Sequence, residues 1–129
     1  RDRSKKFLFR FIMATVNQFK FFGVNLATTA ETAMFGTDSS GTQLPTINQT
    51  YIVKSLRITN NTGNTPTITI KNNAFNIINT QTLSANASTE ILSLPLVVEG
   101  STALKVTMSS TDSVTIGISY MNINKETID

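Results

Sequence analysis

The residues that most often perform acid–base or metal chemistry are scarce in this chain of 129 residues. It contains no His and no Cys, so it lacks the usual proton carrier near neutral pH and the thiolate ligands of metal ions. The acidic residues beyond position 2 share no spacing; they are Glu31, Asp38, Glu90, Glu99, Asp112, Glu126 and Asp129. Because nothing here predicts a paired acid and base, we expect a protein that is not an enzyme and has no cofactor or metal ion.

The stretch "GTDSSGTQ" at 36–43 has two glycines at the separation found in phosphate-binding loops. In such a loop a Lys and then a Ser or Thr follow the second glycine, whereas Thr42 and Gln43 stand there in this chain. Without the lysine no side chain reaches the phosphate groups. We therefore interpret the stretch as a surface loop.

Two aspartates, Asp38 and Asp112, each stand beside a serine in a predicted loop. Carboxylate and hydroxyl oxygens are ligands that Ca²⁺ accepts, which makes a calcium site the functional alternative. Neither aspartate has a second acid close by in the sequence, and Asp in a turn commonly binds its own backbone. We predict turn chemistry at both positions.

The two tyrosines raise the alternative of a sugar-binding platform, since exposed aromatic rings stack on sugars. The chain has no Trp, however, and Tyr120 alternates with Val114, Ile116 and Ile118 on one side of a predicted strand. This spacing predicts that Tyr120 belongs to the core with its hydroxyl near the rim.

The elements that must position these residues are short β-strands. The chain contains 21 Thr, 12 Ser and 13 Asn, residues that suit strands and the turns between them. Alternation of apolar and polar residues predicts strands at 16–22, 31–36, 50–59, 65–71, 75–79, 89–94, 103–109 and 113–123. About eight strands without helical patterns between them indicate an all-β protein, an antiparallel β-sandwich of jelly-roll type, with a barrel as the alternative.

The positive charge of the chain is concentrated at its beginning. Five of the first ten residues are basic and only Asp2 is acidic, so residues 1–12 carry +4 while residues 13–129 sum to −1. We therefore divide the chain into a basic, Phe-rich arm (1–12) and a β-sandwich domain (13–129). The apolar stretch in the arm is interrupted by Arg10 and is shorter than the ~20 residues of a membrane span, so no membrane partner is predicted. A signal peptide would place basic and apolar regions in this order, but Arg10 breaks the apolar stretch and no convincing small-x-small cleavage site follows it. A second alternative is that Met13 is the usual start of the protein and residues 1–12 are an upstream extension.

The arm has the pattern of an extended strand with one apolar side. Phe7, Phe9 and Phe11 lie on one side and Arg10 on the other. Such a segment can complete a sheet edge of its own or a neighbouring subunit. We predict a subunit-contact arm formed by Lys5, Lys6, Phe7, Phe9, Arg10 and Phe11. The alternative is nucleic acid bound by charge and stacking, which a single +4 segment supports less well.

From Met13 onward the chain resembles small β-sandwich structural proteins of tailed bacteriophages, such as capsid decoration (cement) proteins and neck or tail accessories. The similarity lies in "ATVNQFKFFGVNLATTAETAMF", in "YIVKSLRITNNTGNTPTITI" and in "LSANASTEILSLPLVVEGSTALKVTMSSTDSVTIGISYMNI". The basic extension before Met13 departs from the usual pattern, so the resemblance implies nothing about the arm.

The resemblance implies a non-enzymatic virion protein, assembled in the bacterial host cytoplasm, that bridges major capsid or neck and tail subunits. It also implies a homo-oligomer, with trimers frequent among cement proteins. A decoration protein on the head is the favoured expectation. The alternatives are a neck, tail or fibre-attachment protein and a receptor- or glycan-binding module.

Overall fold

The computed structural model describes residues 15–125, and all of its regular elements are strands. The predicted arm lies outside the described residues. The strands are β1 (Thr15–Leu26), β2 (Thr32–Ala33), β3 (Gln49–Asn60), β4 (Thr67–Asn72), β5 (Phe75–Thr82), β6 (Ser88–Glu90), β7 (Leu96–Glu99), β8 (Leu104–Met108) and β9 (Val114–Lys125). Within this part of the chain no helix has the length and apolarity needed to cross a membrane.

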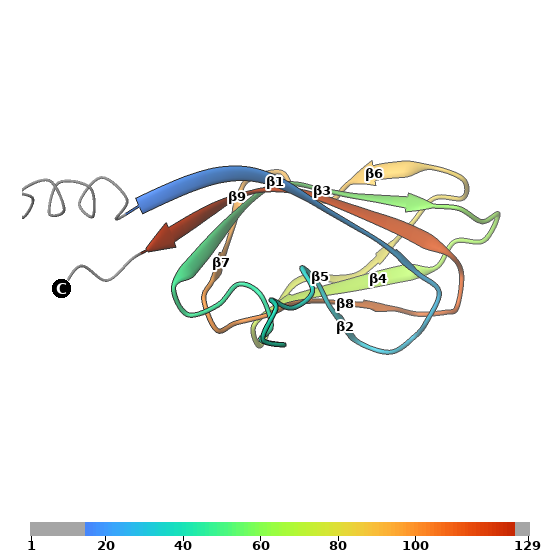
Figure 1. The fold of residues 1–129 in the computed structure, drawn as a ribbon. Helices are drawn as coiled ribbons and strands as arrows, with labels where there is room; N and C mark the ends of the chain where they lie inside the picture. The colour runs from blue at the N-terminus through green and yellow to red at the C-terminus, as the bar shows by residue number, and fades with distance from the viewer. Residues whose placement is uncertain (1–14, 126–129) are drawn as a thin grey trace, which may run out of the picture.

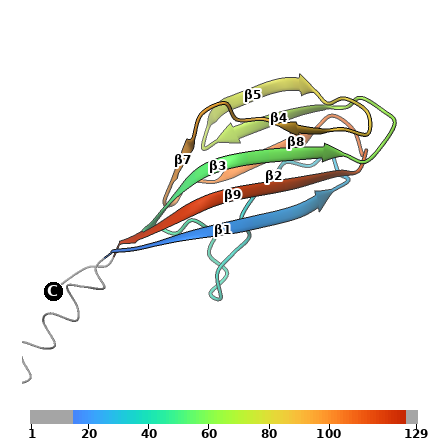
Figure 2. The same cartoon turned by 90° about the horizontal axis from the view of Figure 1, so that it is seen from above.

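The strands form two sheets packed face to face (Figure 1). Sheet A has the order β1-β9-β3, and both β6 and β7 pair with the far side of β3, while sheet B has the order β2-β8-β4-β5. Figure 2 shows β1, β9 and β3 running side by side along sheet A.

This strand order is that of a jelly roll. With β6 and β7 taken as the two halves of one interrupted strand, the antiparallel pairs are β1 with β9, β2 with β8, β3 with β6 and β7, and β4 with β5. Nested pairing of this kind, divided over two four-membered sheets, defines the jelly-roll sandwich. The predicted fold class is therefore confirmed.

The core fills the space between the sheets because strands alternate their side chains between two faces. On β9 the buried positions are Val114, Ile116, Ile118 and Tyr120, as the alternation predicts. The facing sheet supplies buried residues of β4 and β8, which are Ile68, Ile70, Leu104, Val106 and Met108.

The predicted strand at 31–36 is mostly wrong, since only Thr32 and Ala33 are in a strand. The next two residues, Met34 and Phe35, are both buried, at 0% and 5% exposure. A strand cannot bury two consecutive side chains in the same core because they point to opposite faces. The chain instead turns at Phe35, whose φ is 72°, and both side chains enter the core.

The prediction for 89–94 is correct only at its start, because β6 ends at Glu90 and a strand at 96–99 was not predicted. Both short strands follow the irregular course of β3, whose register shifts between Val53 and Ser55. β7 pairs with β3 before this bulge and β6 pairs with it after the bulge. The break between β6 and β7 therefore lies beside the bulge in β3.

Candidate interaction surfaces

Asp38 belongs to a self-contained turn. Its Oδ1 accepts hydrogen bonds from the backbone amides of Ser40 and Thr42, each at 2.9 Å. Gly41, at φ 85°, closes the same loop by donating its amide to the Asp38 carbonyl at 3.0 Å. The carboxylate oxygen binds backbone amides of its own loop, as the turn prediction states.

Asp112 is held by neighbouring side chains in the turn before β9. Ser110 Oγ donates to Oδ2 at 2.5 Å and Asn64 Nδ2 donates to Oδ1 at 2.8 Å. These two hydrogen bonds lower the pKa of the Asp112 carboxyl. Over residues 15–125 the structure brings no three His, Cys, Asp or Glu side chains together as a metal site.

The two tyrosines belong to an aromatic cluster inside the sandwich. Phe35 packs against both tyrosine rings, with its ring centroid 4.9 Å from that of Tyr51 and 4.8 Å from that of Tyr120. Tyr51 is 2% exposed and Tyr120 7%. The prediction that Tyr120 belongs to the core is confirmed, and neither ring is available on the surface for stacking against a sugar.

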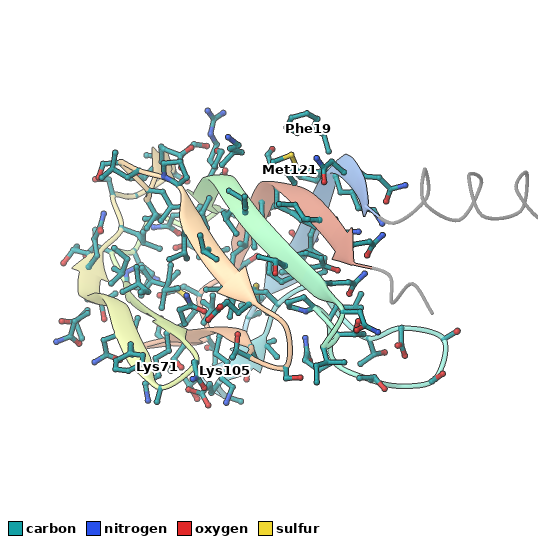
Figure 3. The ribbon with its side chains drawn as sticks, turned by 90° about the vertical axis from the view of Figure 1, so that its left-hand side faces the viewer. Phe19, Lys71, Lys105 and Met121 are labelled. Carbon is teal, nitrogen blue, oxygen red and sulfur yellow. The ribbon has the colours of Figure 1, made fainter. Side chains whose placement is uncertain are left out.

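Sheet A carries an apolar row on its outer face, which we call the apolar belt. Cross-strand pairing aligns Phe19 of β1 with Met121 of β9, Met121 with Ile52 of β3, and Ile52 with Val97 of β7. Phe19 is 80% exposed and Val97 50%. Figure 3 shows Phe19 and Met121 next to each other on this face. Four strands therefore contribute one continuous apolar row to the surface.

Phe21 lies next to the belt and covers the backbone of two strands. A Cβ atom on Gly23 would be 3.0 Å from its ring, and one on Gly117 would be 3.2 Å away. Beside the ring is a shallow pocket of about 330 Å³, lined by Phe21, Gly117, Arg57 and hydroxyl side chains of β3 and β9. The outer face of sheet A thus changes from apolar at the belt to polar at the pocket.

The outer face of sheet B has the opposite character. Lys71 of β4 is directly across from Lys105 of β8, and Glu31 Oε atoms lie 4.0 and 3.9 Å from their Nζ atoms. Figure 3 shows the two lysines on the side of the sandwich away from Phe19 and Met121. Charged side chains of β4 and β8 thus lie on the outer face of sheet B, whereas the belt on the outer face of sheet A is apolar.

The predicted contact residues of the arm, Lys5, Lys6, Phe7, Phe9, Arg10 and Phe11, all lie outside the described residues. Sequence reasoning missed the apolar belt. The sequence contains only part of the information needed to find the belt. Alternation along the strand predicts that the Phe19 side chain points to the other face of the sheet from Phe22 and Val24. It does not predict which residues of β3, β7 and β9 lie beside Phe19. Register between distant strands supplies that information.

Comparison with family models gives no match, and no curated protein matches the chain either. Among solved structures, the chain is similar to a pilus of Bacillus endospore appendages, at 11% identity and a TM-score of 0.49, covering 88% of this chain and 90% of the other. The nucleoplasmin-like N-terminal domain of Drosophila FKBP39 aligns at 13% identity and a TM-score of 0.47, covering 86% and 93%. The virus-like particle protein of extra small virus from the prawn Macrobrachium rosenbergii aligns at 11% identity and a TM-score of 0.45, covering 88% and 81%. These values describe a loose likeness of fold, so function has to be inferred from the surfaces of the chain itself.

Proposed function

We propose that this chain is a non-enzymatic structural protein of a tailed-bacteriophage virion, most simply a decoration protein that bridges shell subunits on the head. The observation that carries the proposal is the apolar belt. A contiguous apolar row rimmed by polar residues is typical of a surface that another protein covers. The proposal also draws on the sequence resemblance from Met13 onward.

The contrast between the two outer faces gives the protein an orientation. Burying the belt removes the exposed ring of Phe19 and half-exposed Val97 from water, which is favourable by about 25 cal/mol per Å² of apolar surface. Burying Lys71, Lys105 and Glu31 would require desolvation of charged groups. We infer that sheet A faces the neighbouring virion protein and sheet B faces solvent.

The arm supplies the second contact in this proposal. Residues 1–12 are assigned to contact a neighbouring subunit through Lys5, Lys6, Phe7, Phe9, Arg10 and Phe11, and residues 13–129 to the sandwich. Two contacts per copy, repeated over many copies, allow each individual contact to be weak while the assembly stays tight. The proposal also includes a homo-oligomer, as the sequence resemblance implies.

The location of the protein in purified particles tests the proposal. Electron cryomicroscopy should show copies of the jelly roll repeated at the symmetry positions of the head, with sheet A inward. A single ring at the neck or tail would replace the decoration role with that of an accessory protein. Absence of the chain from purified particles would refute the virion role.

A binding experiment separates the belt from general surface effects. Phe19→Lys should abolish or strongly weaken binding to particles that lack the protein. Phe75→Lys is the matched control, because Phe75 is 71% exposed but belongs to β5 of sheet B, and it should bind normally. Equal binding by both variants would contradict the assignment of sheet A as the contact face.

A further inference from the structure

The outer edge of β1 is an open pairing edge. All twelve residues of β1 pair with β9, from Thr15 opposite Lys125 to Leu26 opposite Val114, and in the described part of the chain no strand pairs with its other side. Edge strands expose backbone N–H and C=O groups that can receive a further strand. β1 contains no Pro, shows no shift of register against β9, and carries Lys20 as its one charged residue.

The other edges of the two sheets are protected. β2, β6 and β7 are two, three and four residues long. β5 is longer, but its register against β4 shifts twice and Thr80 within it has a φ of 51°. Short and irregular edges are the usual means by which β-proteins prevent unwanted pairing. Among the described strands, β1 is the long and regular edge.

The side chains at this edge favour an aromatic partner. Phe19 and Phe21 are 80% and 69% exposed on the outer face of sheet A, and a strand added beside β1 would place every second side chain next to them. Aromatic cross-strand pairs stabilise a sheet. The arm carries Phe7, Phe9 and Phe11, which occur at every second residue, as Phe19 and Phe21 do.

We infer that a second copy of the chain, and not the chain's own arm, supplies that strand. Residues 11–15 are Phe-Ile-Met-Ala-Thr and contain no Gly, Pro, Asn or Asp, the residues that form tight turns. The sequence thus offers none of these residues for a tight turn that would fold residues 1–12 back onto β1 of the same chain. A strand that runs from the arm straight into β1 pairs antiparallel with the same strand of a second copy, and this generates a two-fold axis.

We propose that two copies pair antiparallel through their arms and β1 strands, with the axis at Ala14, so that the two sheets A become one continuous sheet. This rests on the proposed role of the arm as a subunit contact. The axis at Ala14 places Phe9 and Phe7 opposite Phe19 and Phe21 of the second copy. The belts of the two copies then lie on the same face of the joined sheet.

Lys20 selects this register. Symmetric antiparallel registers place both Phe19 and Phe21 opposite phenylalanines when the axis is at Ala14, Thr15 or Lys20. An axis at Thr15 places Arg10 of one copy opposite Lys20 of the other, and an axis at Lys20 places the two Lys20 side chains opposite each other. Like charges directly opposite one another destabilise a sheet. With the axis at Ala14, Lys20 faces Leu8 and Arg10 faces Gln18.

Single-cysteine cross-linking of the full chain tests the pairing, because the natural sequence contains no Cys. Directly opposite residues have Cα atoms about 4.5–5.5 Å apart, which a disulfide can span. Ala14→Cys should therefore give a disulfide-linked dimer under mild oxidation. Ala74→Cys is the matched control, since Ala74 is an exposed alanine in the turn between β4 and β5, and it should stay monomeric on a denaturing gel. No dimer from Ala14→Cys, or equal amounts from both variants, would overturn the proposal.

Light scattering gives an independent measurement on the unmodified chain. The mass should correspond to two copies. Phe19→Lys should weaken the dimer about tenfold, because the two-fold axis creates two Phe9–Phe19 pairs and the substitution removes both. A monomer or a trimer of the unmodified chain would contradict the two-fold pairing. Both measurements use the purified chain alone, so their outcome is separate from the location of the protein in particles.

Discussion

The ring of Phe21 lies over Gly117 of the neighbouring strand, where a methyl group on residue 117 would be 3.2 Å from ring atoms Cε1 and Cζ. Phe21 also covers Gly23, its own strand neighbour, whose Cβ would be 3.0 Å from Cε2. Glycine weakens a strand because it has no side chain to pack, and an aromatic ring laid across it restores that packing. The outer face of sheet A is thus stabilised by one ring over two glycines.

This relationship predicts coupling between residues 21 and 117. Phe21→Ala should lower the free energy of unfolding by about 0.5–1 kcal/mol. Gly117→Ala should stabilise the Phe21→Ala variant by about 0.5–1 kcal/mol, but not the natural chain, where the ring must move. Urea unfolding of the natural chain, the two single variants and the double variant measures the coupling, and additive effects would show that the ring and the glycine act independently.

Gly100 is predicted to tolerate no larger residue. A Cβ there would be 2.3 Å from the carbonyl oxygen of Thr46 and 2.8 Å from that of Gln49, so the 99–102 turn and the 46–49 turn would have to separate. Gly100→Ala should lower the free energy of unfolding by roughly 1–3 kcal/mol, the range for overpacking. Gly63→Ala is the control, because nothing lies within 4 Å of its Cβ position; a similar loss in both variants would refute the explanation.

Glu90 is predicted to make stability depend on pH in the acidic range. Burial alone would raise its pKa, but hydrogen bonds from the Ser55 hydroxyl and the amides of Leu56 and Leu92 outweigh that effect and lower it. The unfolded chain then binds the proton more tightly, so the stabilisation is complete above the ordinary carboxyl pKa and is lost as the pH falls through the folded pKa.

The measurement is urea unfolding of Glu90→Gln at neutral pH and at pH about 3. Because Glu90 is exposed, we expect the variant to lose only about 1 kcal/mol at neutral pH, and the difference from the natural chain should shrink in acid. Glu99→Gln, at an exposed glutamate of β7, is the matched control and should change stability by less than about 0.5 kcal/mol. A Glu90→Gln difference that stays constant with pH would contradict the assignment.

Tyr51 is predicted to resist ionisation. Burial, with a smaller contribution from the Tyr120 hydroxyl, raises the pKa of Tyr51 to about 12 from an ordinary value of 10.0. The folded chain then holds the phenolic proton more tightly than the unfolded chain, so this contribution to stability is complete below pH 10 and is lost as the pH rises towards 12.

Ultraviolet absorbance of the phenolate follows this titration directly, since the chain has only two tyrosines and no Trp. Tyr120→Phe isolates the signal of Tyr51, which should appear at higher pH in the folded chain than in the chain unfolded by urea. Coincident titration curves for the folded and unfolded chain would show that Tyr51 is accessible to solvent.

Predictions from the sequence were most accurate where one strand's pattern carried the whole signal. Alternation identified β3, β4, β8 and β9 to within three residues of their ends, and it placed Tyr120 in the core. It was wrong at Met34 and Phe35, where two consecutive apolar residues are both buried. It also missed β7, because that strand exists only as the partner of the first part of β3, before the bulge.

Local patterns in the chain determined most of the strands, which side of each of these strands is apolar, and the turn at Asp38, because each of these depends on neighbours within a few residues. The tertiary structure decided that Phe19, Met121, Ile52 and Val97 form one row and that β1 lies at an open edge. Those features depend on register and strand order between segments far apart in the chain, and no local preference specifies them.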